Sequence, residues 1–212
     1  MPEDGDDQVT AVLAAVSALD GSYLAVQGPP GAGKTYLAGR LIQHLIAQGK
    51  SVGICSTSHK AIENAMLAAT GQPPPPTAHA ESDDVNGAEG AGGLEGADGA
   101  LPWRPLVAAA KKQRSGAPVE PAHRPPWDTP RDLRALAAWR EAHPDGHLVG
   151  DTAWAFANPT LAAVPFDVLI IDEAGQFALA DTLAVAPAAR NLVLLGDPQQ
   201  LPQVVAGIHP EG

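Results

Sequence analysis

Cysteine is scarce in this chain: Cys55 is the only one among 212 residues, so no disulfide can form within the chain. A lone thiol is typical of a reducing compartment, and we therefore expect a cytoplasmic protein. No uninterrupted apolar run reaches the ~18 residues of a membrane-spanning helix, so no membrane partner is expected. The acidic first residues, MPEDGDDQVT, also lack the apolar stretch of a secretory signal. The length suits one ordinary domain or slightly more.

Positive charge is missing from two stretches of the chain. Residues 1–20 hold five acidic side chains and residues 71–100 hold six, with no Lys or Arg in either stretch. These eleven acids account for the net charge of −11, and the remaining residues carry 13 acidic and 13 basic side chains. The acidic balance therefore does not exclude nucleic-acid binding by the rest of the chain.

Aromatic residues are absent from residues 71–100, which instead contain four consecutive prolines and many Gly, Ala and acidic residues. Such a composition buries too little apolar area to offset the entropy lost on ordering. We therefore expect residues 71–128 to form a low-complexity, largely disordered insertion, in which the basic residues 111–114 can order against a partner. Residues 129–146 predict a helix that leads back to the core, with Thr129 as its cap.

Strand and helix patterns alternate on both sides of this insertion. The expected strands are 23–26, 51–55, 168–171 and 192–195, with a weaker one at 147–150, and the expected helices are 34–48 and 59–69. The two apolar runs that lack alternation are typical of strands covered on both faces. The predicted fold class is therefore α/β, a parallel sheet with helices on both faces, formed by residues 1–70 and 147–212.

A glycine-rich loop joins the first strand to the first helix of this pattern. It fits the pattern G-x-x-x-x-G-K-[ST] and comprises Gly28, Pro29, Pro30, Gly31, Ala32, Gly33, Lys34 and Thr35. Its glycines allow successive backbone N–H groups to face phosphate oxygens at a helix N-terminus. Lys34 is then expected to reach the β- and γ-phosphates of ATP, and Thr35 to bind Mg²⁺. The sequence predicts a P-loop NTPase.

Two carboxylates, Asp172 and Glu173, follow the predicted strand 168–171. The carboxyl end of a buried parallel strand lies beside the nucleotide crevice in such folds. We expect Asp172 to bind Mg²⁺ and Glu173 to act as general base toward the attacking water.

Gly196-Asp197-Pro198-Gln199-Gln200-Leu201-Pro202 follows the strand 192–195, at the same predicted edge. A glutamine amide both donates and accepts hydrogen bonds, so Gln200 is expected to sense the γ-phosphate.

The stretches QGPPGAGKT, DEAGQ and GDPQQLPQ occur in that order and resemble motifs I, II and III of superfamily 1 helicases. The most similar branch contains the nonsense-mediated-decay helicase and its bacterial relatives. The resemblance covers residues 1–70 and 147–212 and implies a RecA-like ATPase domain that drives movement along single-stranded DNA or RNA. Residues 58–62, 152–154 and 209–212 more narrowly resemble bacterial helicases that are often fused to a RecB-like nuclease.

The same resemblance implies further site residues. STSHKAIENAM, residues 56–66, is similar to motif Ia, which contacts the nucleic-acid backbone, and GDTAWAF, residues 150–156, is similar to motif Ic. Gln8 matches the position of an adenine-reading glutamine. The implied nucleic-acid contacts are Thr57, Ser58, His59, Lys60 and Trp154, with Phe156 as a second stacking face.

The resemblance also implies a partner, since motifs IV to VI belong to a second RecA-like domain that supplies an arginine to the transition state. We expect this chain alone to bind ATP and Mg²⁺ and to hydrolyse ATP slowly. Two other interpretations stay open. One is a stand-alone or hexameric P-loop ATPase, against which Gln176, Gln200 and Leu201-Pro202 argue. The other is a non-catalytic, nucleotide-dependent binding module, against which the intact Lys34, Asp172 and Glu173 argue.

Overall fold

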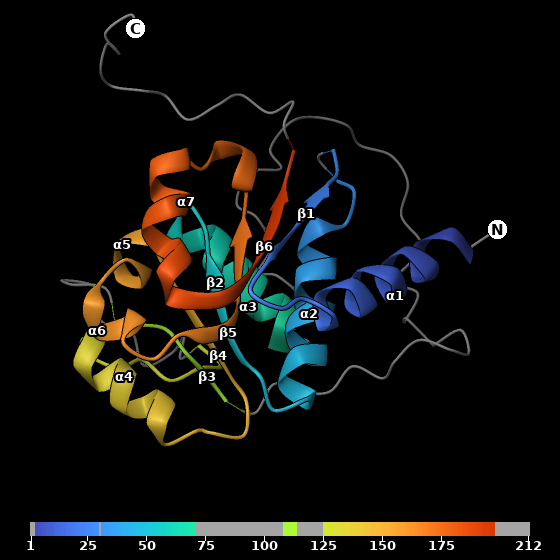
Figure 1. Cartoon of the computed structure of the whole chain (residues 1–212). Coiled ribbons are helices and arrows are strands. Elements are labelled where there is room, and N and C mark those ends of the chain that lie inside the picture. Colours follow the sequence, from blue (N-terminus) through green and yellow to red (C-terminus); the bar gives the residue numbers. More distant parts are fainter. Residues whose placement is uncertain (1–2, 30, 71–107, 114–124, 198–212) are drawn as a thin grey trace, which may run out of the picture.

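Six parallel strands pair in the order β1-β6-β5-β2-β4-β3 in the computed structural model (Figure 1). The structure describes residues 3–29, 31–70, 108–113 and 125–197. The strands are β1 (Tyr23–Gln27), β2 (Ser51–Cys55), β3 (Ala109–Ala110), β4 (His147–Asp151), β5 (Phe166–Asp172) and β6 (Ala189–Gly196). The predicted α/β parallel sheet is thereby confirmed, including the weaker strand at residue 147.

Helices cover both faces of the sheet. The helices are α1 (Glu3–Ser17), α2 (Lys34–Ala47), α3 (His59–Thr70), α4 (Leu133–Glu141), α5 (Ala153–Phe156), α6 (Pro159–Ala162) and α7 (Leu179–Val185), with the 3-10 turns η2 (Ala174–Gln176) and η3 (Ala186–Ala188). One core cluster joins α1, α2 and α3 to one face of the sheet, and a second joins α4 to α7 to the other face.

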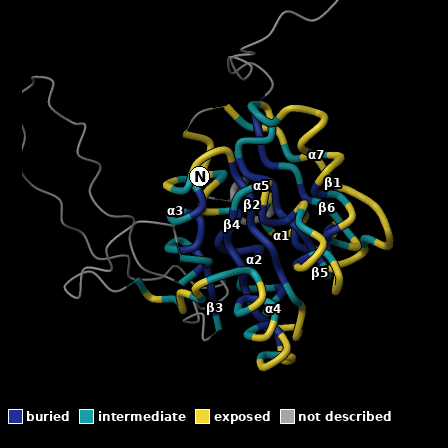
Figure 2. Tube along the Cα trace, turned by 90° about the vertical axis from the view of Figure 1, so that its left-hand side faces the viewer, coloured by how far each residue is buried: buried dark blue, intermediate teal, exposed yellow. Residues whose placement is uncertain are grey.

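The central strand β5 shows why its sequence is apolar without alternation. Val168 and Ile170 belong to the core beneath α2 and α3, whereas Leu169 and Ile171 belong to the core beneath α5 and α6. All four side chains are buried, since each face of the strand has its own helical layer. Figure 2 shows this buried centre, with the exposed segments at the outer turns and around α7.

The strand register aligns the carboxyl ends of four neighbouring strands. Gln27 of β1 pairs with Gly196 of β6, and Asp172 of β5 pairs with Leu195 of β6. On the other side of β5, Cys55 of β2 pairs with Ile171, and it also pairs with Asp151 of β4. The loops that follow these strands therefore begin at nearly the same level of one sheet edge.

Two expectations differ from the structure. The predicted insertion 71–128 contains described residues that join the sheet: β3 pairs with β4, and Asp128 forms a bridge with Ala110. The short apolar run around Ala109 was too brief to predict as a strand. Residues 71–107 and 114–124 of that prediction lie outside the described residues.

The helix predicted at 129–146 begins later than expected. Its cap is Asp132, whose Oδ1 accepts a hydrogen bond from the Ala135 N–H at 2.8 Å, and not Thr129. Thr and Asp are both good N-cap residues, but a cap must stand three positions before the helical N–H that it accepts from. Asp132 stands there, and Thr129 does not.

Cys55 is fully buried in β2, as expected for an inert thiol, and burial is the main cause that raises its pKa, followed by the charges of Asp151 and Asp181. The cytoplasmic location stays a prediction. Among the described residues, no helix combines the length and the apolar character that a membrane crossing requires.

Helices α2 and α3 pack closely because Gly39 has no side chain. A Cβ atom at position 39 would lie 2.8 Å from the backbone oxygen of Ala68, which cannot move aside as a side chain could. Helix propensity alone predicts that Gly39→Ala stabilises the fold by ~1 kcal/mol. The close approach predicts instead a loss of about 1–3 kcal/mol in the free energy of unfolding, measured by urea denaturation.

The exposed Ala47 in the last turn of the same helix offers a matched control. Ala47→Gly reports propensity without packing and should cost about 1 kcal/mol or less at this helix end. A Gly39→Ala protein that is more stable than the parent would contradict the packing argument.

Candidate nucleotide and nucleic-acid site

The glycine-rich loop leaves β1 and curls into the first turn of α2. Gly31 and Gly33 have positive φ angles of 78° and 76°, which L side chains rarely adopt, so both glycines are needed for the turn. Lys34 Nζ donates to the carbonyl oxygens of Gly28 at 2.6 Å and Pro29 at 2.9 Å. The half-buried ammonium therefore lies against the loop backbone, and the exposed Thr35 sits beside it in the helix. Pro30 lies outside the described residues.

Asp172 ends β5 and is 93% buried, given its relative exposure of 7%. Burial is the main cause that raises its pKa; the charge of Glu173 adds to this. A hydrogen bond from the Glu173 N–H at 3.0 Å and the charge of Lys34 act in the opposite direction. The glycine-rich loop lies at the same sheet edge as the acidic pair, because the Gly28 N–H meets the carbonyl oxygen of Gly196 at 3.1 Å while Asp172 pairs with Leu195.

Glu173 has an unusual backbone conformation. Its φ of 56° makes it the one non-glycine residue with a positive φ in the described part of the chain, and it is the N-cap of the turn η2. Left-handed backbone costs a side-chain-bearing residue free energy, and such strain clusters at functional sites. Its Oε2 accepts hydrogen bonds from Thr57 Oγ1 at 2.8 Å and from Ser56 Oγ at 3.1 Å.

The loop after β6 touches both of the other loops. The Gly28 N–H donates to the carbonyl oxygen of Gly196 at 3.1 Å. A Cβ atom at Gly196 would lie 2.7 Å from the backbone nitrogen of Gly175, so the β6 loop and η2 are in backbone contact. Asp197 is 93% buried beside them. Gln200, the predicted γ-phosphate sensor, lies outside the described residues.

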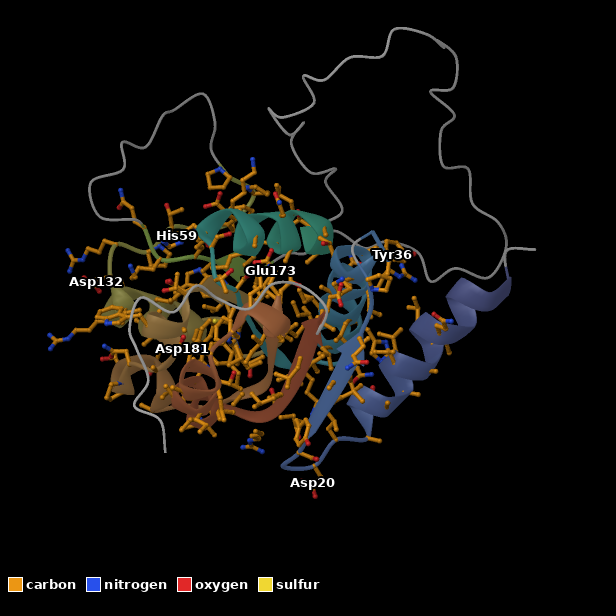
Figure 3. All side chains as sticks on the ribbon, turned by 90° about the horizontal axis from the view of Figure 1, so that it is seen from above. Asp20, Tyr36, His59, Asp132, Glu173 and Asp181 are labelled. Atoms are coloured by element: carbon orange, nitrogen blue, oxygen red, sulfur yellow. The ribbon has the colours of Figure 1, made fainter. Side chains whose placement is uncertain are left out.

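The predicted nucleic-acid residues gather at the same edge. Figure 3 looks down on it, with Glu173 near the middle and His59 at the start of α3. Ser58 caps α3, since its Oγ accepts a hydrogen bond from the Ala61 N–H at 3.1 Å, and Lys60 is exposed in the first turn. Trp154 on α5 is 70% exposed.

Phe156 was expected to offer a second stacking face, and this expectation is wrong. Its ring is fully buried and meets the ring of Phe166 edge-on, with 5.5 Å between centroids. The two aromatic residues of α5 lie on opposite sides of this short helix, so one faces solvent and the other the core.

Gln8 is exposed on α1, and its adenine-reading role stays a prediction.

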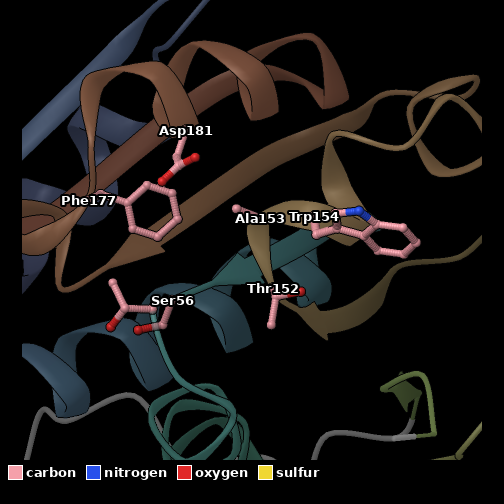
Figure 4. A pocket seen from close by; sticks show the side chains of 7 residues that line it. Ser56, Thr152, Ala153, Trp154, Phe177 and Asp181 are labelled. Carbon is pink, nitrogen blue, oxygen red and sulfur yellow. The ribbon is translucent and has the colours of Figure 1, made fainter. Parts of the chain in front are cut away.

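A pocket of about 270 Å³ opens between β2, β4 and α7 (Figure 4). Phe177 and Asp181 face Ser56 and Thr152 across it, and Trp154 stands at its side. Its walls are formed by Ser56, Thr57, Thr152, Ala153, Trp154, Phe177 and Asp181. The pocket thus combines hydroxyl groups, two aromatic rings and the carboxylate of Asp181. Aromatic rings are faces on which nucleic-acid bases can stack.

Ser56, Phe177 and Asp181 line this pocket but were not among the site residues predicted from the sequence. The position of Ser56 could have been recognised from the sequence, because it directly follows a predicted strand, as Asp172 follows the predicted strand 168–171. Phe177 and Asp181 had no such signal, since their approach to the pocket depends on how η2 and α7 fold back over the sheet. The described residues contain no group of three His, Cys, Asp or Glu side chains able to hold a metal ion on their own.

The parallel sheet, the glycine-rich loop and the acidic pair at one edge define a P-loop ATPase domain. Residues 12–206 match the family described as the AAA domain. Because this match covers most of the chain, the protein belongs to that family.

Distant relatives carry helicase names. The chain is 24% identical over 215 residues to the DNA replication ATP-dependent helicase/nuclease DNA2 of Xenopus laevis, covering 97% of this chain and 18% of that protein. It is 26% identical over 204 residues to the DNA replication ATP-dependent helicase/nuclease JHS1 of Arabidopsis thaliana, covering 94% and 12%. With dna2 of Schizosaccharomyces pombe the identity is 26% over 200 residues, covering 94% and 12%.

The resemblance to the ATPase region of superfamily 1 helicases is thereby confirmed. The chain spans less than a fifth of the length of these relatives.

The buried Asp172 should destabilise the nucleotide-free fold at neutral pH. A carboxyl whose folded pKa is raised binds its proton more tightly in the folded state, so its contribution to stability falls as pH rises above its usual pKa near 3.8. We expect Asp172→Asn to increase the free energy of unfolding at pH 7 and to increase it less at pH 4. The amide oxygen of Asn can still accept the Glu173 N–H.

Chemical denaturation at both pH values measures this effect, with Asp145→Asn as an exposed control that should change little. An Asp172→Asn protein no more stable than the parent at pH 7 would show that burial of the carboxylate is compensated in the fold.

Proposed function

We propose that this chain is the ATP-hydrolysing half of a superfamily 1 helicase, which couples hydrolysis to movement along single-stranded nucleic acid. The observation that carries the proposal is the meeting of Lys34, Asp172 and Glu173 at one sheet edge, next to a pocket of hydroxyls and aromatic rings. The names of the relatives favour DNA as the strand. They also support this proposal over a stand-alone or hexameric ATPase and over a non-catalytic module.

Each residue has a role in this proposal. The backbone N–H groups of the glycine-rich loop bind the phosphate chain of ATP, and Lys34 neutralises charge on its β- and γ-phosphates. Asp172 and Thr35 present the carboxylate and hydroxyl oxygens that Mg²⁺ prefers, so the donor set fits this ion. Bound there, Mg²⁺ would offset the phosphate charge.

Glu173 accepts a proton from water while the water oxygen attacks the γ-phosphorus. The bond from that phosphorus to the β–γ bridging oxygen then breaks, which leaves ADP and phosphate.

A second RecA-like domain completes the site in this proposal. Arg190 cannot supply the expected arginine, because it lies six residues before Gly196 at the amino end of β6, on the order of 20 Å from the loop edge. Transition-state arginines are worth roughly 10³–10⁵ in rate, so we expect slow hydrolysis by residues 1–212 alone.

The first test replaces the proposed base. Glu173→Gln should lower the ATPase rate of the full-length protein by about 10²–10⁴-fold, because a neutral amide cannot take the proton from water. Binding of a fluorescent ATP analogue should persist. Glu141→Gln, exposed at the end of α4, is the matched control.

Rates are measured with and without single-stranded DNA and RNA oligonucleotides. A Glu173→Gln protein that hydrolyses ATP like the parent would remove the enzymatic proposal, and a parent that neither polymer stimulates would remove the helicase proposal.

The second test concerns the strand. Trp154→Ala should weaken binding of a single-stranded oligonucleotide by about 5- to 150-fold, since base stacking on an aromatic ring contributes about 1–3 kcal/mol. The fold should be unaffected because the indole is 70% exposed. Tyr23→Ala removes another exposed ring, at the amino end of β1 and far from the pocket, and should bind like the parent. Fluorescence anisotropy measures both, and equal affinities for the two variants would exclude stacking at Trp154.

A further inference from the structure

Two hydroxyl groups belong both to the pocket and to the proposed base. Ser56 and Thr57 line the pocket, and both donate to Oε2 of Glu173, at 3.1 Å and 2.8 Å. Ser56 is 98% buried, whereas Thr57 is exposed. A strand that enters the pocket can therefore reach the Thr57 hydroxyl first.

A hydroxyl has one proton to donate. While Thr57 Oγ1 donates to Glu173, it cannot donate to a phosphate or base oxygen in the pocket. A strand acceptor that takes this proton therefore withdraws it from the carboxylate. The pocket and the base compete for a single donor.

The topology indicates what this hydrogen bond does to Glu173. The strand order places β2 on one side of β5, and β6 and β1 on the other. The glycine-rich loop follows β1, so the loop after β2 holds the Glu173 carboxylate on the side of β5 away from β1. Hydrogen bonds to an ionised group are among the stronger ones, and two of them on one oxygen fix the side chain in that position.

We propose that Thr57, with Ser56, is a positioning residue that holds Glu173 in a resting position, and that a bound strand releases the carboxylate by taking over the Thr57 hydroxyl. ATP hydrolysis then accelerates when the strand is bound. This inference rests on the proposed function, because it requires that Glu173 is the base and that the pocket receives the strand.

The experiment compares Thr57→Val with Thr57→Ser in the full-length protein. Valine keeps the shape and removes the donor, while serine keeps the donor. We expect Thr57→Val to raise kcat without a strand, to leave the KM for ATP unchanged, and to reduce the stimulation by saturating oligonucleotide by about tenfold, the lower end expected for a hydrogen bond to a charged group. Thr57→Ser should restore the coupling.

Thr160→Val, exposed at the start of α6, is the control that should behave like the parent. A Thr57→Val protein with the parental rate and the parental stimulation overturns the inference and leaves the proposed function intact. A fall in kcat without a strand also overturns it, because it would mean that the hydroxyl holds Glu173 in its active position. Failure of the proposed function itself shows differently, as activity that survives Glu173→Gln or as a parent that no strand stimulates.

Discussion

The backbone contact between Gly28 and Gly196 depends on the register of the parallel sheet, and the rest of the site depends on that register. Gln27 and Gly196 are paired strand ends, so the next N–H along β1 meets the carbonyl of Gly196 at 3.1 Å. Asp172 pairs one residue earlier, with Leu195. A shift of one residue in any of these strands would turn each side chain to the other face and lift one loop away from the others. The chemistry at this edge is therefore held together by main-chain pairing deep in the fold.

Much of this arrangement could be predicted from local sequence. The runs 168–171 and 192–195 fix two buried strands, and loops after parallel strands must emerge at one edge, so the meeting of Gly28, Asp172 and Gly196 follows from pattern and topology. The backbone conformation of Glu173 and the hydrogen-bond partners of its side chain could not be predicted in this way. Its left-handed backbone and its hydrogen bonds to Ser56 and Thr57, 117 and 116 residues earlier in the chain, arise from tertiary packing. Phe156 was misassigned for a different reason: a helix of four residues is too short for its periodicity to show which side faces the core.

The site is built from groups that a stable fold would avoid. Asp172 is a carboxylate buried among strand ends, and Glu173 has a backbone conformation that suits glycine better. Neither belongs to the two core clusters, which consist of apolar side chains on either face of the sheet. The central strands supply the stability that lets these costly groups persist at their carboxyl ends. The close backbone contact at Gly175 and Gly196 likewise serves the site, because a side chain at either position would push the two loops apart.

The strand β2 connects the two proposed activities. It pairs with β5 on one side, which ends at the acidic pair, and with β4 on the other, which ends before Thr152 and Trp154. The loop after β2 thus lies between the residues proposed to hydrolyse ATP and those proposed to bind the strand. Long-range conformational change is not required for a signal between them, because one exposed hydroxyl contacts the base on one side and lines the pocket on the other. The coupling between strand binding and ATP hydrolysis then depends on which acceptor the Thr57 hydroxyl donates to. A bound strand releases Glu173 only to the extent that its acceptor binds this hydroxyl in preference to the carboxylate.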